Sequence, residues 1–216
     1  GVIAYRDIAD TNTMIETASV YKKAVVIGGG LLGLEAANGL MRRGMDVSVV
    51  HVAPWLMERQ LDDVAGKLLQ KSLEARGLTF IMGGQTQEFV GNAEGRVSAI
   101  RFKDGSELST DLVVMAVGIR PNTELAEKIR LQVNRGIVVN DTMQTTTDPR
   151  IYSVGECAAH RGIAYGLVAP LFEQAKVAAN HLAQFGIGRY QGSLTSTKLK
   201  VTGIDLFSAG QFMGGE

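Results

Sequence analysis

Hydrophobic and polar positions repeat along the first half of the chain with two different periods. Short apolar runs predict strands that are covered on both faces of a parallel sheet, at Ala24–Ile27, Val47–Val50, Thr79–Met82 and Leu112–Val117. Helical spacing predicts one helix before the first strand, at Asp7–Ala18, and two between strands, at Leu34–Arg43 and Asp62–Arg76. The last of these helices places Val64, Leu68, Leu69 and Leu73 on its inner face. This alternating order indicates an α/β doubly wound, Rossmann-like sheet.

A different pattern interrupts the alternation after the third strand. Thr86–Val90 and Val97–Lys103 alternate polar and apolar residues, and Lys-Asp-Gly-Ser at 103–106 is typical of a tight turn. We therefore expect an antiparallel meander laid against the parallel sheet.

The second half of the chain predicts fewer and shorter elements. Ile137–Val139 and Ile151–Val154 are predicted strands, and Val168–Phe185 is a predicted helix. The packing face of that helix is rich in alanine and comprises Leu171, Ala175, Ala178, Ala179 and Leu182. Alternation returns at Lys198–Ser208. The apolar side chains of this second half are too few to form a separate closed core. We therefore interpret the second half as part of a larger domain.

The first predicted strand runs directly into a glycine turn. Gly28, Gly30 and Gly33 stand at the G-x-G-x-x-G spacing that opens a dinucleotide-binding helix. Gly28 permits the tight turn, Gly30 lets a pyrophosphate approach the backbone, and Gly33 allows close packing of helix and strand. A glycine triplet alone also occurs in ordinary turns. The strand before it and the helix after it favour dinucleotide binding.

Composition narrows the possible classes of function. The 216 residues are 45% hydrophobic and 20% charged, which is typical of a globular protein. A formal net charge of zero offers no basic field for nucleic acid or for a membrane surface. The single cysteine, Cys157, excludes an internal disulfide and a multi-cysteine metal site within this chain. A reducing, cytoplasmic setting is the simplest interpretation.

Several segments together resemble the pyridine-nucleotide-disulfide oxidoreductases. They include Val-Ile-Gly-Gly-Gly-Leu-Leu-Gly-Leu-Glu-Ala-Ala at 26–37, Ala-Pro-Trp-Leu-Met-Glu-Arg-Gln-Leu-Asp at 53–62, Gly-Ile-Arg-Pro-Asn at 118–122 and Ile-Tyr-Ser-Val-Gly-Glu-Cys-Ala at 151–158. Gly-Leu-Val-Ala-Pro at 166–170 and Ser-Thr-Lys-Leu-Lys at 196–200 extend the resemblance. Within the superfamily, the chain is similar to the large subunits of NAD(P)H-dependent nitrite reductases.

This resemblance implies an FAD-dependent enzyme that takes electrons from NAD(P)H as hydride. Residues 1–119 would be the NAD(P)H-binding domain, 120–188 the C-terminal part of an FAD-binding domain, and 189–216 the start of an interface segment. The chain begins Gly-Val and stops at Met-Gly-Gly-Glu, which predicts a fragment. The glycine motif that grips FAD would lie upstream, and siroheme and 4Fe–4S modules downstream. We expect the fragment alone neither to hold FAD tightly nor to reduce nitrite.

The resemblance also assigns candidate cofactor-binding residues, while no catalytic side chain or metal ligand is predicted. The candidate cofactor-binding residues are Gly28, Gly29, Gly30, Leu31, Leu32, Gly33, Glu35, His51, Arg59, Gly118, Gly155, Glu156 and Val168. Glu35 would reach the nicotinamide end of the cofactor, or it is only a first-turn carboxylate favoured by the helix dipole. Leu31 replaces an aromatic residue that often gates the nicotinamide pocket in relatives, or it only packs.

His51 departs from the pattern of NAD-selective relatives. It ends the second strand, where such proteins place an acid on the ribose hydroxyls. An imidazole would not repel a 2′-phosphate, and Arg59 nearby adds positive charge. A histidine at a strand end is also often a plain polar residue. The choice between NADH and NADPH stays open, with dual use slightly favoured.

The flavin side depends on a second group of residues. Glu156 stands where relatives bind the FAD ribityl chain with Asp, and the helix from Val168 would direct its N-terminus at the flavin ring. With an incomplete site, Glu156 is alternatively only a loop acid. Cys157 is expected to be buried, without a redox role, and His160 and His181 to be surface or packing residues.

Two rival functions remain at this point. One is a rubredoxin- or ferredoxin-reductase-like flavoenzyme without a siroheme module. The other is a non-catalytic nucleotide-binding, redox-sensing module, because a fold does not fix a function.

Overall fold

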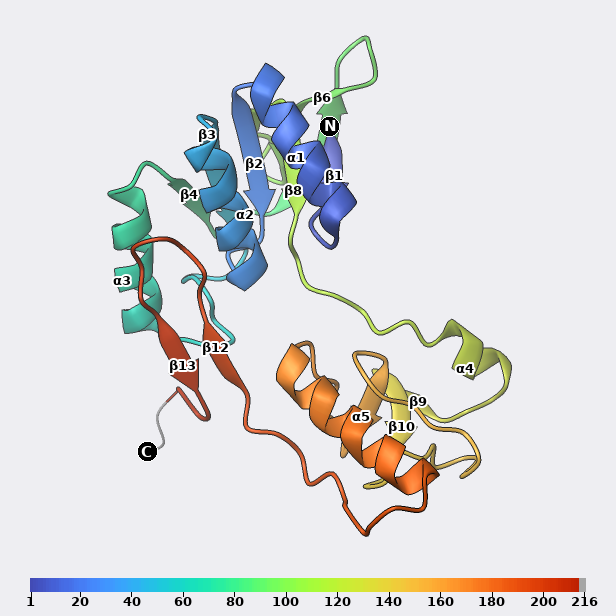
Figure 1. The fold of residues 1–216 in the computed structure, drawn as a ribbon. Helices are drawn as coiled ribbons and strands as arrows, with labels where there is room; N and C mark the ends of the chain where they lie inside the picture. Colours follow the sequence, from blue (N-terminus) through green and yellow to red (C-terminus); the bar gives the residue numbers. More distant parts are fainter. Residues whose placement is uncertain (214–216) are drawn as a thin grey trace. The chain divides into compact units, whose positions relative to one another are not determined.

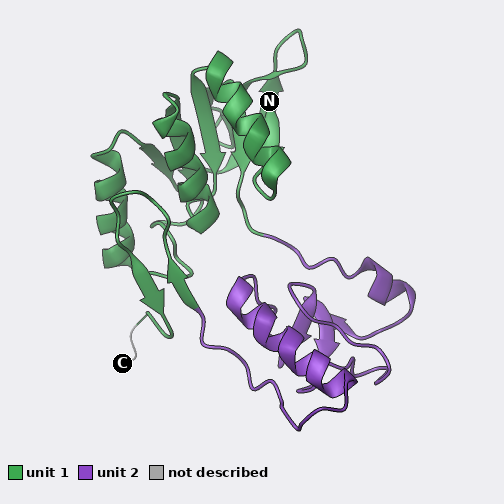
Figure 2. Ribbon diagram, in the orientation of Figure 1, with its two compact units in different colours: residues 1–118, 196–216 green, residues 119–195 purple. Residues whose placement is uncertain are grey.

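The chain divides into two compact units, which the computed structural model describes over residues 1–213. Unit 1 comprises residues 1–118 together with the segment that begins at Ser196. Unit 2 comprises Ile119–Thr195 (Figure 2). The chain therefore leaves unit 1 once and returns to it.

A five-stranded parallel sheet forms the centre of unit 1 (Figure 1). Its strand order is β1-β8-β2-β3-β4, and every neighbouring pair is parallel. The strands are β1 (Val2–Ala4), β2 (Lys23–Ile27), β3 (Asp46–His51), β4 (Thr79–Met82) and β8 (Leu112–Met115). The predicted fold class, a Rossmann-like doubly wound sheet, is confirmed, although β1 was not predicted.

Three helices cover one face of this sheet. They are α1 (Ile8–Val20), α2 (Leu31–Arg42) and α3 (Asp63–Glu74). Met14, Leu34, Leu40 and Leu73 from these helices pack in one core cluster with Val26 and other strand residues. Asp7 and Asp62 cap α1 and α3 through their side chains, which satisfies amides in the first turn of each helix.

The predicted meander covers the other face of the sheet. It consists of β5 (Thr86–Gly91), β6 (Val97–Phe102) and β7 (Glu107–Ser109), in the order β5-β6-β7. Ile100 and Phe102 pack there against Val25, Val50 and Val113 of the parallel sheet. The sheet is thus buried on both faces, which explains why its strands read as continuous apolar runs.

Unit 2 is a small α/β assembly with a core cluster of its own, so the expectation that this half has too little apolar surface for a separate core was wrong. Its elements are α4 (Glu124–Lys128), β9 (Val133–Asn134), β10 (Gly136–Val139), β11 (Ala158–His160) and α5 (Val168–Leu182). Met143, Ala158, Tyr165 and Tyr190 form its core with Ala178 of α5.

The segment after unit 2 packs back on unit 1. It contains the hairpin β12 (Ser196–Lys198) and β13 (Phe207–Ala209). Between these strands, Leu199 and Val201 enter the core cluster of the three helices. Arg76 donates hydrogen bonds to the carbonyls of Thr202 and Gly203, which fixes the turn against the end of α3.

Two predicted helix faces were only partly right: Leu69 and Leu73 of α3 are buried, and Ala178 of α5 is buried with Leu171 packed beside it. On α3, Val64 and Leu68 are 70% and 68% exposed, because Gly66 and not Val64 faces inward. A Cβ on Gly66 would lie 2.5 Å from Cδ1 of Trp55, so this face must approach the loop closely. On α5, residues Ala175, Ala179 and Leu182 are exposed, whereas Gln174 and Ala178 are buried.

The predicted strand at Ile151–Val154 was also wrong. Only Tyr152 forms a single bridge there, with Gln144, and the strands that pair with β10 are β11 and β9. Cys157, predicted to be buried, is half-buried.

Candidate functional site

The turn between β2 and α2 depends on glycine at two positions. Gly28 has φ +117°, and a Cβ there would lie 2.3 Å from the carbonyl oxygen of Ala116. A Cβ on Gly33 would lie 1.8 Å from the carbonyl oxygen of Gly28. Both contacts are with backbone atoms, so a side chain at Gly28 would push the turn away from Ala116, and a side chain at Gly33 would push α2 away from the turn.

Gly30 differs from these two glycines. No atom lies within 4 Å of the place that its Cβ would occupy, so the backbone faces open space there. Gly30 is the N-cap of α2, and no side chain caps the helix. The first-turn amides, those of Leu31, Leu32 and Gly33, have no acceptor within the helix and carry its positive dipole end. This arrangement can accept an anionic group against the backbone.

The C-terminal ends of three neighbouring strands meet at this turn. Gly28 donates its amide hydrogen to the carbonyl of Val50 on β3 (2.8 Å), and Ala116, after β8, donates to Ile27 (2.8 Å). Gly118, with φ +95°, follows two residues later. In doubly wound sheets the ligand crevice lies outside this edge.

His51 is joined to the glycine turn. Its Nδ1 accepts the amide hydrogen of Gly29 (3.0 Å), and its Nε2 lies 3.0 Å from Oε2 of Glu58. A second hydrogen bond joins the loop to the turn, because Met57 donates its amide hydrogen to the carbonyl of Gly29 (3.0 Å). The loop after β3 is therefore fixed to the turn, and both ring nitrogens of His51 are engaged.

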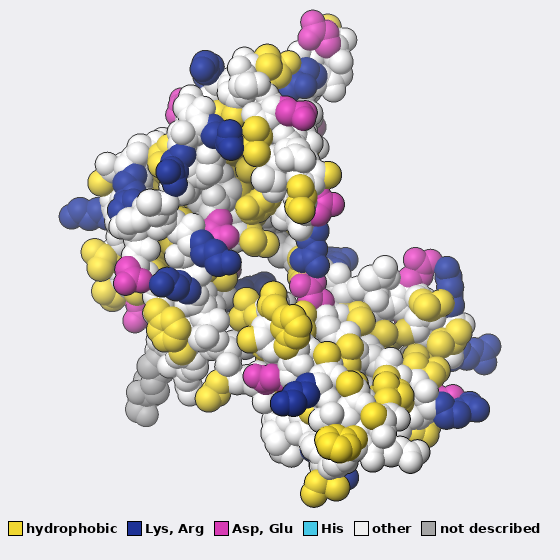
Figure 3. Space-filling view, in the orientation of Figure 1, with side chains coloured by type: hydrophobic (Ala, Val, Ile, Leu, Met, Phe, Trp, Pro, Cys, Tyr) yellow, Lys and Arg dark blue, Asp and Glu magenta, His cyan; other side chains and the backbone are white. Residues whose placement is uncertain are grey.

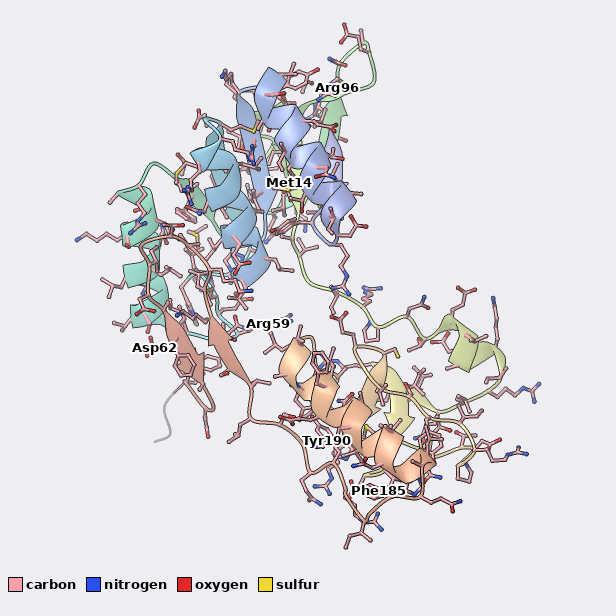
Figure 4. All side chains as sticks on the ribbon, in the orientation of Figure 1. Met14, Arg59, Asp62, Arg96, Phe185 and Tyr190 are labelled. Carbon is pink, nitrogen blue, oxygen red and sulfur yellow. The ribbon has the colours of Figure 1, made fainter. Side chains whose placement is uncertain are left out.

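Arg59 follows in the same loop and is exposed (Figure 4). It makes no ion pair or side-chain hydrogen bond with the described residues. Its position beside Glu58 places one fixed carboxylate and one free guanidinium near the glycine turn.

Glu35 lies in the second turn of α2, so its interpretation as a first-turn carboxylate was wrong. Its Oε1 accepts the amide hydrogen of Lys200 (3.1 Å), which ties α2 to the returning segment. Neither this contact nor Glu58 was anticipated from the sequence, because both depend on tertiary pairing.

In unit 2, the flavin-side candidates Gly155 and Glu156 lie in a loop that α5 holds in place. Gly155 has φ +92° and donates its amide hydrogen to Oε1 of Gln174 (3.0 Å). Gln174 is fully buried, and its Nε2 has no hydrogen-bond partner among the described residues. Gln174 was missed from the sequence; the signal was an amide side chain four residues before Ala178 on the face of α5 that packs in the core.

The N-terminus of α5 is open. Its N-cap, Leu167, provides no side-chain hydrogen bond, there is no acid in the first turn, and Val168 is exposed. An orphaned buried amide, a left-handed glycine with an acid beside it and an uncapped helix N-terminus fit part of a flavin site.

Other polar clusters of unit 2 have structural roles. His160 is buried, and its Nε2 lies 2.8 Å from Oδ1 of Asp141, which also accepts hydrogen bonds from Arg161. Arg161 first, and His160 second, hold the pKa of Asp141 below its usual range. Burial raises the pKa of Tyr190, whose ring packs on His160.

His181 is held differently, since its Nδ1 lies 2.6 Å from the Tyr152 hydroxyl. Both histidines thus act in packing, as predicted. Among residues 1–213, no group of three His, Cys, Asp or Glu side chains could hold a metal ion. No helix in that range is long and apolar enough to cross a membrane.

Comparison with known proteins places this geometry in a family. The family model for pyridine nucleotide-disulphide oxidoreductases matches residues 1–181. A nitrite reductase [NAD(P)H] of Bacillus subtilis is 62% identical over 98% of the chain, and an assimilatory nitrate reductase electron transfer subunit of the same organism is 50% identical over 100%. The chain spans 26% and 28% of these two proteins.

Solved structures agree with the sequence relatives. A ferredoxin reductase from Rhodopseudomonas palustris superposes with a TM-score of 0.88 at 26% identity, covering 95% of this chain and 51% of that one. Putidaredoxin reductase, in its covalent complex with putidaredoxin, gives 0.89 at 29% identity, covering 97% and 51%. The glycine turn, the strand order and the extent of these matches lead to one conclusion: the chain belongs to the pyridine nucleotide-disulphide oxidoreductase family.

Proposed function

We propose that this chain is the electron-input part of an FAD-dependent NAD(P)H oxidoreductase, and that the full protein reduces nitrite to ammonia. The observation that carries the first half is the glycine turn, with an open backbone at Gly30 and close backbone contacts at Gly28 and Gly33. The 62% identity to a nitrite reductase supports the second half.

In unit 1, the residues bind and orient the nicotinamide dinucleotide. The uncapped amides at the start of α2 hold the pyrophosphate, and the helix dipole adds favourable electrostatics. Gly118 and the end of β8 border the same edge of the sheet and leave room for the nucleotide. Glu35 holds the returning segment against α2 beside it.

In unit 2, residues 120–188 are proposed as the C-terminal part of an FAD-binding domain. Gln174 fixes the Gly155 amide and so positions the backbone that carries Glu156. The N-terminus of α5 offers partial positive charge to an anionic ligand. Bound FAD would supply the acceptor for hydride from the reduced nicotinamide, while these residues provide orientation and electrostatics.

The rest of the proposal concerns the connection of this chain to the other parts of the full protein. An upstream segment would complete the FAD site, and downstream siroheme and 4Fe–4S modules would carry out nitrite reduction. The segment 189–216 would begin the connection to them. The single cysteine is consistent with a cytoplasmic setting.

A second candidate function is electron transfer to a nitrate reductase, because the electron transfer subunit of such an enzyme is 50% identical. The full-length parent protein distinguishes the two. Under anaerobic conditions, NADH or NADPH should bleach its flavin absorbance, and added nitrite should restore it with formation of ammonium. Bleaching without nitrite-dependent recovery would favour the second candidate, and no bleaching would contradict both.

A further inference from the structure

The loop after β3 carries an acid that is linked to the glycine turn through His51, and this acid lies seven residues beyond the strand end. Glu58 is joined to His51 at the end of β3, with 3.0 Å between Oε2 and Nε2. The side chain of His51 is 7% exposed and that of Glu58 is 34% exposed. The histidine is therefore internal, whereas the carboxylate reaches the surface of unit 1.

The hydrogen bonds of His51 determine which tautomer fits. Nδ1 must accept, because its partner is the amide hydrogen of Gly29. Nε2 then carries the proton and donates it to the Glu58 carboxylate. This neutral tautomer satisfies both contacts, and it leaves neither nitrogen for a ribose hydroxyl. His51 is thus a positioning residue, which aims Glu58 and fixes Gly29.

The backbone fixes Glu58 independently. Met57 is buried, has φ +54°, and donates its amide hydrogen to the carbonyl of Gly29. Gln60 and Leu61 both donate to the carbonyl of Met57, at 2.8 and 2.9 Å, and close a turn around Glu58. Glu58 is therefore fixed at its backbone by the turn and at its carboxylate by His51. Little conformational entropy of this side chain remains to be lost when it binds a ligand.

A carboxylate near this turn discriminates between the two nicotinamide dinucleotides. The adenosine ribose of NADH offers 2′ and 3′ hydroxyl donors, whereas NADPH carries a 2′-phosphate. A fixed carboxylate accepts hydrogen bonds from the hydroxyls and repels the phosphate.

Arg59 acts in the opposite direction, since a guanidinium attracts phosphate. It is exposed and unpaired among the described residues, so its long side chain must be ordered on binding and its charge is screened by salt. We therefore expect Glu58 to influence the preference between NADH and NADPH more strongly than Arg59 does.

We infer that Glu58, aimed by His51, replaces the missing acid at the end of β3 and makes this chain prefer NADH to NADPH. The inference rests on the proposed binding of a nicotinamide dinucleotide at the glycine turn. It differs from the sequence-based expectation, which slightly favoured the use of both NADH and NADPH. That expectation assumed that His51 itself faces the ribose.

The test is a fluorescence titration of the 216-residue chain with NADH and, separately, with NADPH. The wild-type chain should bind NADH more tightly. Glu58→Gln keeps the size of the side chain and removes its charge, so the ratio of NADPH to NADH affinity should rise about tenfold.

Arg59→Gln is the matched control in the same loop. It should lower NADPH affinity and leave the NADH preference in place. Thermal unfolding of each variant checks that the chain is folded.

Three results would overturn the inference. An unchanged affinity ratio in Glu58→Gln, while both nucleotides still bind, would refute the role of Glu58 alone. A wild-type preference for NADPH would also refute it. Failure of the folded wild type to bind either nucleotide would refute both the inference and the proposed nucleotide site.

Discussion

The carboxylate of Glu35 accepts a hydrogen bond from the backbone amide of Lys200, which lies 165 residues further along the chain. The bond joins α2, whose N-terminus forms the glycine turn, to the segment that returns after unit 2. The two parts of unit 1 that are far apart in sequence are therefore held together beside the candidate nucleotide site.

Glu35→Ala removes this bond. We expect the free energy of unfolding to fall by about 1 kcal/mol, because one partly exposed hydrogen bond is lost. Hydrogen exchange of the Lys200 amide should accelerate, while amides in the meander keep their protection. Unchanged exchange at Lys200 would mean that the bond does not persist in solution.

Gly33→Ala tests the close approach of α2 and β2. The added Cβ would lie 1.8 Å from the carbonyl oxygen of Gly28, so the helix must shift. We expect a loss of about 3 kcal/mol or more in the free energy of unfolding, and loss of nucleotide binding.

Gly39→Ala is the control for this substitution on the same helix. Nothing lies within 4 Å of its Cβ position, so alanine should stabilise the helix by about 0.5–1 kcal/mol. If both variants lost similar stability in urea unfolding, the close contact at Gly33 would not be the cause.

Gln174→Met tests the support of the Gly155–Glu156 loop. Methionine keeps the volume but offers no acceptor to the Gly155 amide, so we expect unit 2 to lose about 1–3 kcal/mol of stability. In the full-length parent, retained FAD per protein should also fall. Lys176→Gln, on the exposed side of α5, should change neither quantity; equal effects of the two substitutions would rule out a specific role for Gln174.

The stability of unit 2 should depend on pH through Asp141. Hydrogen bonds from Arg161, and then the contact with His160, hold the pKa of this carboxyl below its ordinary value of 3.8. A depressed folded-state pKa stabilises the fold above that ordinary value, and this contribution is lost as the pH falls toward the folded-state pKa. Asp141→Asn should therefore be less stable than wild type at pH 7, and the difference should shrink in strong acid. A difference that stayed constant with pH would contradict the assignment.

Features set by local patterns could be predicted from the sequence. The apolar runs gave four strands of the parallel sheet, and the spacing of Gly28, Gly30 and Gly33 located the turn where strand meets helix. Turn chemistry at 103–106 located the turn after β6, although the strand that follows it, β7, was not predicted. Each of these signals is contained within a few neighbouring residues.

Features set by tertiary contact could not be predicted. The inner face of α3 depends on Gly66, which is small enough to approach Trp55, and hydrophobicity alone favoured Val64 and Leu68. The inner face of α5 depends on Gln174, because the Gly155 amide needs an acceptor. His51 was noticed, but its partner Glu58 depends on the fold of the loop between them.

Hydrophobic side chains also remain on the outer side of α5, as Figure 3 shows. Val168, Phe172 and Leu182 are 68%, 73% and 61% exposed. That unit 2 is part of a larger domain stays a prediction, and exposed apolar side chains of this kind are typical of a surface that packs against another protein segment.

The central claim is that the glycine turn at the start of α2 binds a nicotinamide dinucleotide. Gly30→Asp tests it most directly, because the Cβ position is open and φ is −86°, so the chain should stay folded. The wild type should show saturable NADH binding by nucleotide fluorescence, and the variant should lose it, because the new carboxylate repels the pyrophosphate. Equal NADH binding by both folded proteins would place the nucleotide elsewhere and contradict the account.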